Sequence, residues 1–115
     1  MQLESAKFLW DALQACDLIL TFTAGKSFEN YEDDVLLRSA VERQFEIVGE
    51  ALNQMSKIDS PTANAIPQFR QAVSFRNLLI HGYSAVDDRV VWTVVVEHLP
   101  PLKLALVAML EHLPP

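Results

Sequence analysis

Apolar side chains recur three and four positions apart over residues 3–20, which is the spacing of an amphipathic helix. Asp17 is a polar break in this pattern, and Gly25 follows as a residue suited to a helix C-terminus. We therefore expect a first helix from about residue 3 to Ala24. Its apolar stripe would consist of Leu3, Ala6, Leu9, Trp10, Leu13, Cys16 and Leu20.

A second amphipathic pattern begins at Val35, after a polar connector at 27–34 that has room for a short helical turn. The segment 57–67 contains Pro61, Pro67 and several turn-forming residues, so the second helix should end there. The apolar stripe of this helix would be Leu37, Ala40, Val41, Gln44, Val48, Ala51, Leu52 and Met55.

Pro67 fits the first turn of a third helix, where its missing N–H group costs no hydrogen bond. Gly82 lies just past the expected end of this helix, and a helix stop of the usual kind would fold Tyr83 back over Leu78. The residues that face the core from this helix would be Phe69, Ala72, Val73 and Leu79.

The segment 89–98 is rich in β-branched valines and could be misread as a strand. No other segment offers a pairing partner, and an isolated strand cannot satisfy its backbone, so we predict a helix with Asp87 as its N-cap. Pro100 and Pro101 should kink or break it, and a last helical stretch should run to about Leu113. The whole pattern predicts one all-α domain over residues 1–115, an antiparallel bundle of four to five helices.

The chain has 115 residues, a net charge of −6 and a pI of about 4.9. An acidic protein is not held to nucleic acid by general electrostatics, so any such contact needs a local cationic patch. Cys16 is the only cysteine, which excludes an internal disulfide and favours a buried small apolar side chain. The N-terminus lacks the pattern of a signal peptide, and Lys103 and Glu111 interrupt an apolar C-terminal stretch too short for a bilayer. We expect a cytoplasmic protein without membrane contact.

Half of the residues are apolar, which is a high share for a bundle of this size. One small core cannot hold all of them, so some should lie in a subunit interface. This predicts a homodimer or a higher homo-oligomer. The residues that exceed the core would include the valines of the fourth helix together with Phe22, Phe28, Phe75 and Trp92.

Two familiar kinds of site fit the sequence poorly. The stretch "AGKS" at 24–27 resembles the end of a phosphate-binding loop, but such a loop needs a glycine at position 20, where the chain has Leu20 within a helix. The histidines at 81, 98 and 112 lack the spacing of metal ligands, and Glu42, Glu46 and Glu50 form the kind of acidic row that is usually solvated. The sequence therefore predicts neither a metal nor a cofactor.

The stretch "FRNLLIHGY" at 75–83 concentrates Arg76, Asn77, His81 and Tyr83 at the end of an otherwise apolar helix. These residues could serve the helix end alone, because a histidine suits the helix dipole and a tyrosine packs well there. They also suit cleavage of RNA, whose 2′-hydroxyl is a built-in nucleophile. Arg76 could bind the phosphate and stabilise its developing charge, and His81 could transfer protons, so no metal would be required.

Arg76 and His81 are five positions apart, which is about 140° around an ideal helix, so they do not share a face. Either the helix ends before His81 and the loop redirects the imidazole, or the two residues serve different copies of the motif. A twofold axis near the third helix would bring two arginines and two histidines into one cleft. That cleft would contain both the acid and the base that the reaction needs.

The pattern Arg76-x-x-x-x-His81-x-Tyr83, with Asn77 after the arginine, resembles the motif of the HEPN superfamily. The wider chain is similar to its HepT-like branch, through "FEIVGEAL" at 45–52, "RNLLIHGY" at 76–83, "VDDRVVW" at 86–92 and "LPPL" at 99–102. The resemblance implies a dimerising helical bundle with a composite cleft. It also implies a metal-independent endoribonuclease that acts as the toxin of a type VII-like toxin–antitoxin pair.

The antitoxin in such pairs is an MNT-type nucleotidyltransferase, which would neutralise the toxin by AMPylation of the motif tyrosine, here Tyr83. The resemblance implies Arg76 as phosphate contact and transition-state stabiliser, His81 as acid–base residue, and Asn77 and Tyr83 as supporting residues. Bulky, anionic adenylate on Tyr83 would repel RNA. Arg70 and Arg43 are the other cations expected near RNA.

Two other functions remain open from the sequence. The chain could be a catalytically weak or inactive interaction module that binds and regulates a nucleotidyltransferase. A less favoured alternative is a helical domain that binds a small molecule or a free nucleotide.

Overall fold

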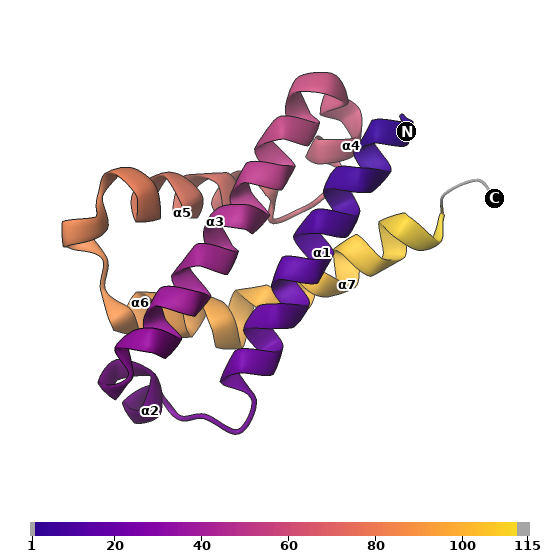
Figure 1. The fold of residues 1–115 in the computed structure, drawn as a ribbon. Helices are drawn as coiled ribbons and strands as arrows, with labels where there is room; N and C mark the ends of the chain where they lie inside the picture. The colour runs from indigo at the N-terminus through magenta and orange to yellow at the C-terminus, as the bar shows by residue number, and fades with distance from the viewer. Residues whose placement is uncertain (1, 113–115) are drawn as a thin grey trace.

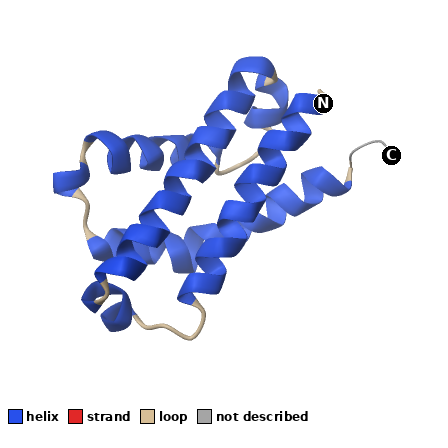
Figure 2. Cartoon of the chain, viewed as in Figure 1, coloured by secondary structure: helices blue, strands red, loops and turns tan. Residues whose placement is uncertain are grey.

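The computed structural model describes residues 2–112, and every secondary-structure element in that range is helical (Figure 2). The expected all-α fold is therefore confirmed. The elements are α1 (Leu3–Thr23), α2 (Phe28–Asp33), α3 (Val35–Ile58), α4 (Ser60–Asn64), α5 (Phe69–His81), the 3₁₀ turn η1 (Tyr83–Ala85), α6 (Asp88–Thr93), the π-helical η2 (Val94–His98) and α7 (Leu99–Glu111).

The long helices α1 and α3 lie side by side in opposite directions and form the centre of the molecule (Figure 1). Local sequence fixes where each begins and ends. Gly25, with φ +72°, follows α1, and Asp34 caps α3 by accepting a hydrogen bond from the Leu37 amide. Between them, Ser27 and Asn30 form a reciprocal capping box that starts the short helix α2.

The buried face of α1 differs from the predicted stripe. Leu9 and Cys16 are fully buried as expected, but Leu3 and Trp10 are 91% and 53% exposed. Small side chains take part of the buried face instead, because they allow α1 to lie close to its neighbours. The buried residues of α1 are Ser5, Leu9, Ala12, Ala15, Cys16, Ile19 and Thr23.

Helix α5 packs across α3 on one edge of the bundle (Figure 1). Phe45 of α3 and Phe75 of α5 meet edge to face, with ring centroids 5.1 Å apart. Only Leu79 of the predicted core residues on α5 is buried, whereas Phe69, Ala72 and Val73 are half-buried. The reason is that α5 has a single helix, α3, as its main packing partner.

The segment 57–67 ends α3 as predicted, because α3 stops at Ile58, but Pro67 does not take its predicted place. Pro61 lies in the first turn of α4, and Pro67 precedes α5, which has Gln68 as its N-cap and Phe69 as its first residue. The prediction that Pro67 lies in the first helical turn is therefore wrong by two positions. The corner at 59–68 is a short helix and a turn instead of an open loop.

Helices α6, η2 and α7 form one continuous helix, Asp88–Glu111, although Pro100 and Pro101 were expected to kink or break it. The π-helical turn ends where the Leu99 amide donates to the Val94 carbonyl, and both prolines then fall in the first turn of α7, where a missing N–H group is tolerated. Asp87 is the N-cap, as predicted. The expected end near Leu113 lies outside the described residues.

This helix is 24 residues long, and its most apolar window has a mean hydropathy of 1.5. It is longer than the apolar stretch that begins at Leu99, because α6 and η2 continue into α7. Length and composition alone are weak evidence, because core helices of soluble proteins meet the same criteria. Here α7 packs on α1 and buries Leu99, Leu102 and Leu106 against it and the rest of the core.

Candidate functional site

The four motif residues lie at the end of α5 and in the turn that follows it, at the left of Figure 1. Arg76 turns toward α3, and 22% of its side chain is exposed. Asn77, His81 and Tyr83 are exposed. The structure therefore separates one partly covered cation from three accessible polar side chains.

Arg76 is held by neighbours on two helices. Its Nη2 lies 2.7 Å from Oε2 of Glu50 on α3, and its Nη1 donates to Oδ1 of Asn77 at 2.9 Å. Its Nε is buried and has no hydrogen-bond partner among residues 2–112. The sequence interpretation assigned Glu50 to a solvated acidic row, so this partner of Arg76 was missed.

Gly49 explains how Arg76 reaches α3. A Cβ atom at position 49 would lie 2.2 Å from Cβ of Arg76 and 2.8 Å from the carbonyl oxygen of Ala72. Only a residue without a side chain permits α5 to approach this closely. The sequence offers a signal for this contact, because Gly49 interrupts an otherwise regular helix.

His81 is the last residue of α5, and Gly82 follows as the C-cap. The helix therefore does not end before His81, and the alternative in which a loop redirects the imidazole is wrong. A histidine in a last helical turn interacts favourably with the helix dipole when it is charged. Within one copy of the chain, Arg76 faces α3 while His81 is exposed to solvent.

Tyr83 begins the turn η1 and is 77% exposed. The prediction that it folds back over Leu78 is wrong, because Gly82 has φ −118° and does not take the left-handed conformation of that helix stop. The other tyrosine, Tyr31, is fully buried in the core. The two phenolic hydroxyls therefore differ completely in accessibility.

The cleft that contains Arg76, which we call the Arg76 cleft, lies between α1, α3 and α5 and has a volume of about 490 Å³. Arg43 of α3 also lines it and lies 3.5 Å from Glu46. Arg70, the other predicted cation, is exposed and is not part of this lining. The other lining residues are Phe8, Asp11, Gln14, Ala15, Leu18, Gln44, Ile47, Glu50, Ala51, Gln54 and Ile80.

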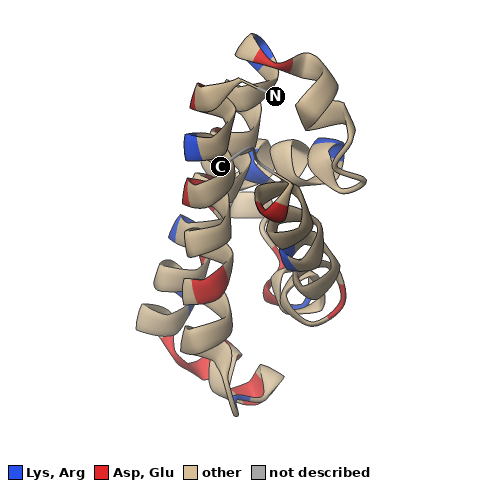
Figure 3. Cartoon of the chain, turned by 90° about the vertical axis from the view of Figure 1, so that its right-hand side faces the viewer, with Lys and Arg blue, Asp and Glu red and all other residues tan. Residues whose placement is uncertain are grey.

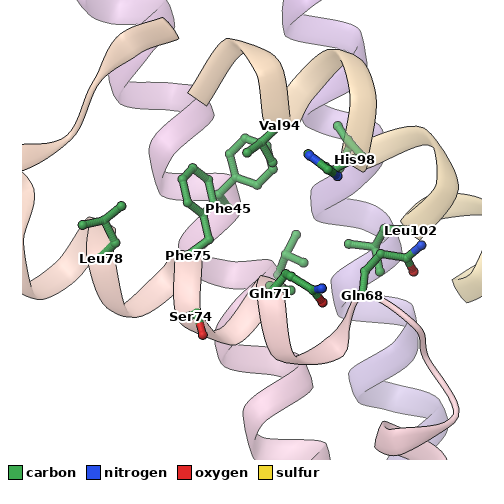
Figure 4. Close-up of a pocket in the computed structure, with 12 residues that line it drawn as sticks. Phe45, Gln68, Gln71, Ser74, Phe75, Leu78, Val94, His98 and Leu102 are labelled. Atoms are coloured by element: carbon green, nitrogen blue, oxygen red, sulfur yellow. The ribbon is translucent and has the colours of Figure 1, made fainter. Parts of the chain in front are cut away.

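A second hollow of about 450 Å³, the apolar groove, opens between α5 and the continuous helix Asp88–Glu111 (Figure 4). Phe45 and Val48 of α3 form its floor, and Phe75 and Leu78 line it from α5. Figure 4 shows His98 next to Val94, on the side of the groove opposite α5. His98 thus belongs to an apolar hollow and is not grouped with His81.

Charge is mixed over the helices instead of concentrated on one face (Figure 3). Residues 2–112 contain no group of three or more His, Cys, Asp or Glu side chains that could hold a metal ion. The stretch at 24–27 forms the turn between α1 and α2, outside any strand–loop–helix context. This turn therefore lacks the structural context of a phosphate-binding loop.

The fold and the motif together define a small all-α protein with an arginine and a histidine at one helix end. The chain belongs to the HepT-like ribonuclease family, whose model matches residues 12–109. A probable ribonuclease HepT of Thermococcus cleftensis is 38% identical over 96 residues, covering 84% of this chain and 86% of that protein. A protein of Caldanaerobacter subterraneus named "putative RNase" is 30% identical over 96 residues, covering 84% and 85%. No solved structure matches this chain.

Proposed function

We propose that this protein is a metal-independent endoribonuclease in which Arg76 binds the scissile phosphate and His81 transfers protons. Membership of the HepT-like ribonuclease family carries the proposal. The 2′-hydroxyl attacks phosphorus after losing its proton to a base, and an acid protonates the leaving 5′-oxygen. Arg76 stabilises the charge that develops on the phosphate oxygens, and Asn77 fixes one end of its guanidinium.

The proposed active unit is a homodimer with a composite cleft. Helix α5 continues through His81, so Arg76 and His81 of one copy point to different faces of the helix, and this supports the proposal. In a twofold dimer the histidine of the second copy would reach the phosphate bound by the arginine of the first. The two histidines would then supply both the acid and the base.

We further propose that the enzyme is a cytoplasmic toxin of a type VII-like pair, and that an MNT-type nucleotidyltransferase antitoxin transfers AMP from ATP to the Tyr83 hydroxyl with release of pyrophosphate. The 77% exposure of Tyr83 supports this, because a modifying enzyme must reach the hydroxyl. Tyr31 is an internal control, since its hydroxyl is buried in the core. With the antitoxin and ATP, native protein and Tyr31→Phe should gain AMP in intact-mass spectra, and Tyr83→Phe should not.

A non-catalytic interaction module is the second candidate, and one observation favours it. Glu50 and Asn77 already engage the Arg76 guanidinium, as they would in a protein whose motif serves structure and docking. In that case the chain would bind and regulate a nucleotidyltransferase without cutting RNA.

The deciding experiment is RNA cleavage by purified protein in the presence of EDTA, comparing the native chain with His81→Ala and Arg76→Ala. The enzyme predicts cleavage by the native chain and a loss of at least about 100-fold in both variants. As controls, circular dichroism checks that all three proteins are folded, and sedimentation checks that they associate to the same extent. Equal inertness of all three, with no adenylate on Tyr83 by intact mass, would leave the interaction module as the better description.

A further inference from the structure

Glu50 connects α3 to the Arg76 guanidinium and is itself fixed in place. Its Oε2 forms an ion pair with Nη2 of Arg76, at 2.7 Å, and its Oε1 accepts a hydrogen bond from Nε2 of Gln54 at 2.8 Å. Both carboxylate oxygens therefore have partners, Gln54 on the same helix and Arg76 on the facing helix. Opposite charges at this distance attract each other, so the ion pair restrains the guanidinium more than neutral Asn77 alone would.

The backbone approach at Gly49 makes the contact short. The Cβ and Cγ atoms of Arg76 lie where a side chain at position 49 would be, so the stem of the arginine rests directly on α3. Its Nε is covered in the process. An arginine stem has several rotatable bonds, and ordering it costs free energy that these contacts offset.

This inference rests on the proposed function, in which Arg76 binds the scissile phosphate. We propose that Glu50 is a positioning residue for Arg76: it holds the guanidinium in the Arg76 cleft, and Gly49 permits the helix contact that brings the two together. Asn77 accepts a hydrogen bond from Nη1, and Glu50 pairs by charge with Nη2. Each terminal guanidinium nitrogen carries two N–H groups, so donors remain for the oxygens of a phosphate.

The first test compares RNA cleavage by Glu50→Ala and Glu50→Gln with that of native protein. Glu50→Ala should lower kcat by about 10- to 100-fold, because the guanidinium loses its ion-pair partner and is no longer held in place, with a smaller change in KM. Glu50→Gln should keep most of the activity, because its amide oxygen still accepts from Arg76. Asp17→Ala is the matched control, since it removes a carboxylate that pairs with Lys103 at 2.6 Å outside both hollows, and it should cleave like native protein.

A double-mutant cycle distinguishes a Glu50 that acts by positioning Arg76 from a Glu50 that contributes to cleavage independently of Arg76. If Glu50 acts through Arg76, Arg76→Ala alone and Arg76→Ala combined with Glu50→Ala should have the same residual activity. A further loss in the double variant would overturn the proposal, and so would full activity of Glu50→Ala when Arg76→Ala is inactive. In both cases the ribonuclease function would stand and only the role of Glu50 would fail.

Nuclear magnetic resonance tests the same inference without activity. The buried Nε–Hε group of Arg76 should give a protected, sharp cross-peak that is absent in Arg76→Ala. Glu50→Ala should broaden or shift this cross-peak, and Asp17→Ala should leave it in place. If native protein without adenylate on Tyr83 cleaves no RNA, the proposed function fails. This cross-peak alone then still decides the positioning role, because an unchanged peak in Glu50→Ala overturns it.

Discussion

Asp59 links the beginning of α1 to the corner between α3 and α4. Its Oδ2 accepts hydrogen bonds from Oγ of Ser5 and from Oγ1 of Thr62, each at 2.7 Å, and from the backbone N–H of Gln2 at 3.2 Å. These donors, led by the two hydroxyls, hold the pKa of Asp59 well below its usual range. The ionised form is therefore the one that the fold stabilises.

The first prediction concerns the pH dependence of this contact. A carboxyl with a lowered pKa in the folded state contributes stability above its unfolded pKa of about 3.9 and loses that contribution as pH falls through the folded value. Asp59→Asn should therefore unfold at a lower temperature than native protein at pH 7, and the difference should shrink below about pH 4. Thermal unfolding between pH 3 and 7 measures it. The exposed Asp33→Asn is the control, and a difference that is independent of pH would contradict the assignment.

Tyr31 gives a second prediction, because its hydroxyl is buried and has no hydrogen-bond partner within residues 2–112. Burial raises the pKa of Tyr31, as expected for a phenol that is hard to ionise away from water. Its ring packs against Trp92, with centroids 5.5 Å apart. The buried ring therefore stabilises the folded protein, whereas the buried hydroxyl without a partner destabilises it.

Tyr31→Phe should keep or raise the free energy of unfolding, by up to about 1–3 kcal/mol, because it removes a desolvated polar group. Tyr31→Ala should lower it by about 3–5 kcal/mol, since it also leaves a cavity. Urea titrations of the three proteins measure both changes. A loss of more than about 1 kcal/mol in the phenylalanine variant would mean that the hydroxyl has a partner in solution.

At the scale of the helix, periodicity located the long elements well. The predicted starts at 3 and 35 and the predicted stop before Gly82 agree with α1, α3 and α5. Periodicity was less able to choose the buried face, because it favours large apolar residues such as Leu3 and Trp10. Close helix packing favours small ones such as Ala12 and Ala15, which depends on the neighbour and not on the helix itself.

Gly49 gives the prediction for the contact between α3 and α5. Alanine is the better helix former by about 1 kcal/mol, so an isolated helix would gain from Gly49→Ala. In the protein the added Cβ would meet Arg76 and the Ala72 carbonyl, and overpacking of this kind costs about 1–3 kcal/mol. We expect a net loss of stability together with reduced RNA cleavage. Ser39→Ala, at an exposed position of α3, is the control in urea unfolding and should cause no loss.

The site was only partly predictable for a related reason. Arg76, Asn77, His81 and Tyr83 stand in one short stretch, so the sequence could group them. Glu50 lies 26 positions before Arg76 and in a row with Glu42 and Glu46 that gives no sign of which acid faces α5. That choice depends on where the two helices cross, which is set by Gly49 and is visible only in three dimensions.

At the scale of the whole molecule, the proposed composite cleft predicts how activity depends on mixed dimers. If both histidines of a dimer act in one cleft, a dimer of native protein with His81→Ala is inactive. Refolding the two in equal amounts should then leave about a quarter of the native activity, because random pairing gives that share of native dimers. Histidines that act singly should leave about half. Activity is plotted against the share of native chains in the mixture. The plot is curved if both histidines are required and linear if each acts alone. Sedimentation checks that native and variant chains form mixed dimers.

The single thiol of the chain makes such assemblies easy to observe. Burial, followed by the nearby Asp17 carboxylate, raises the pKa of Cys16 to about 12, so at neutral pH it is almost entirely protonated and inert. A cysteine introduced at exposed Ser84, beside Tyr83, would then be the one site that takes a spin label. Each dimer would carry a single pair of labels, and their separation would report directly how far apart the two motif turns lie.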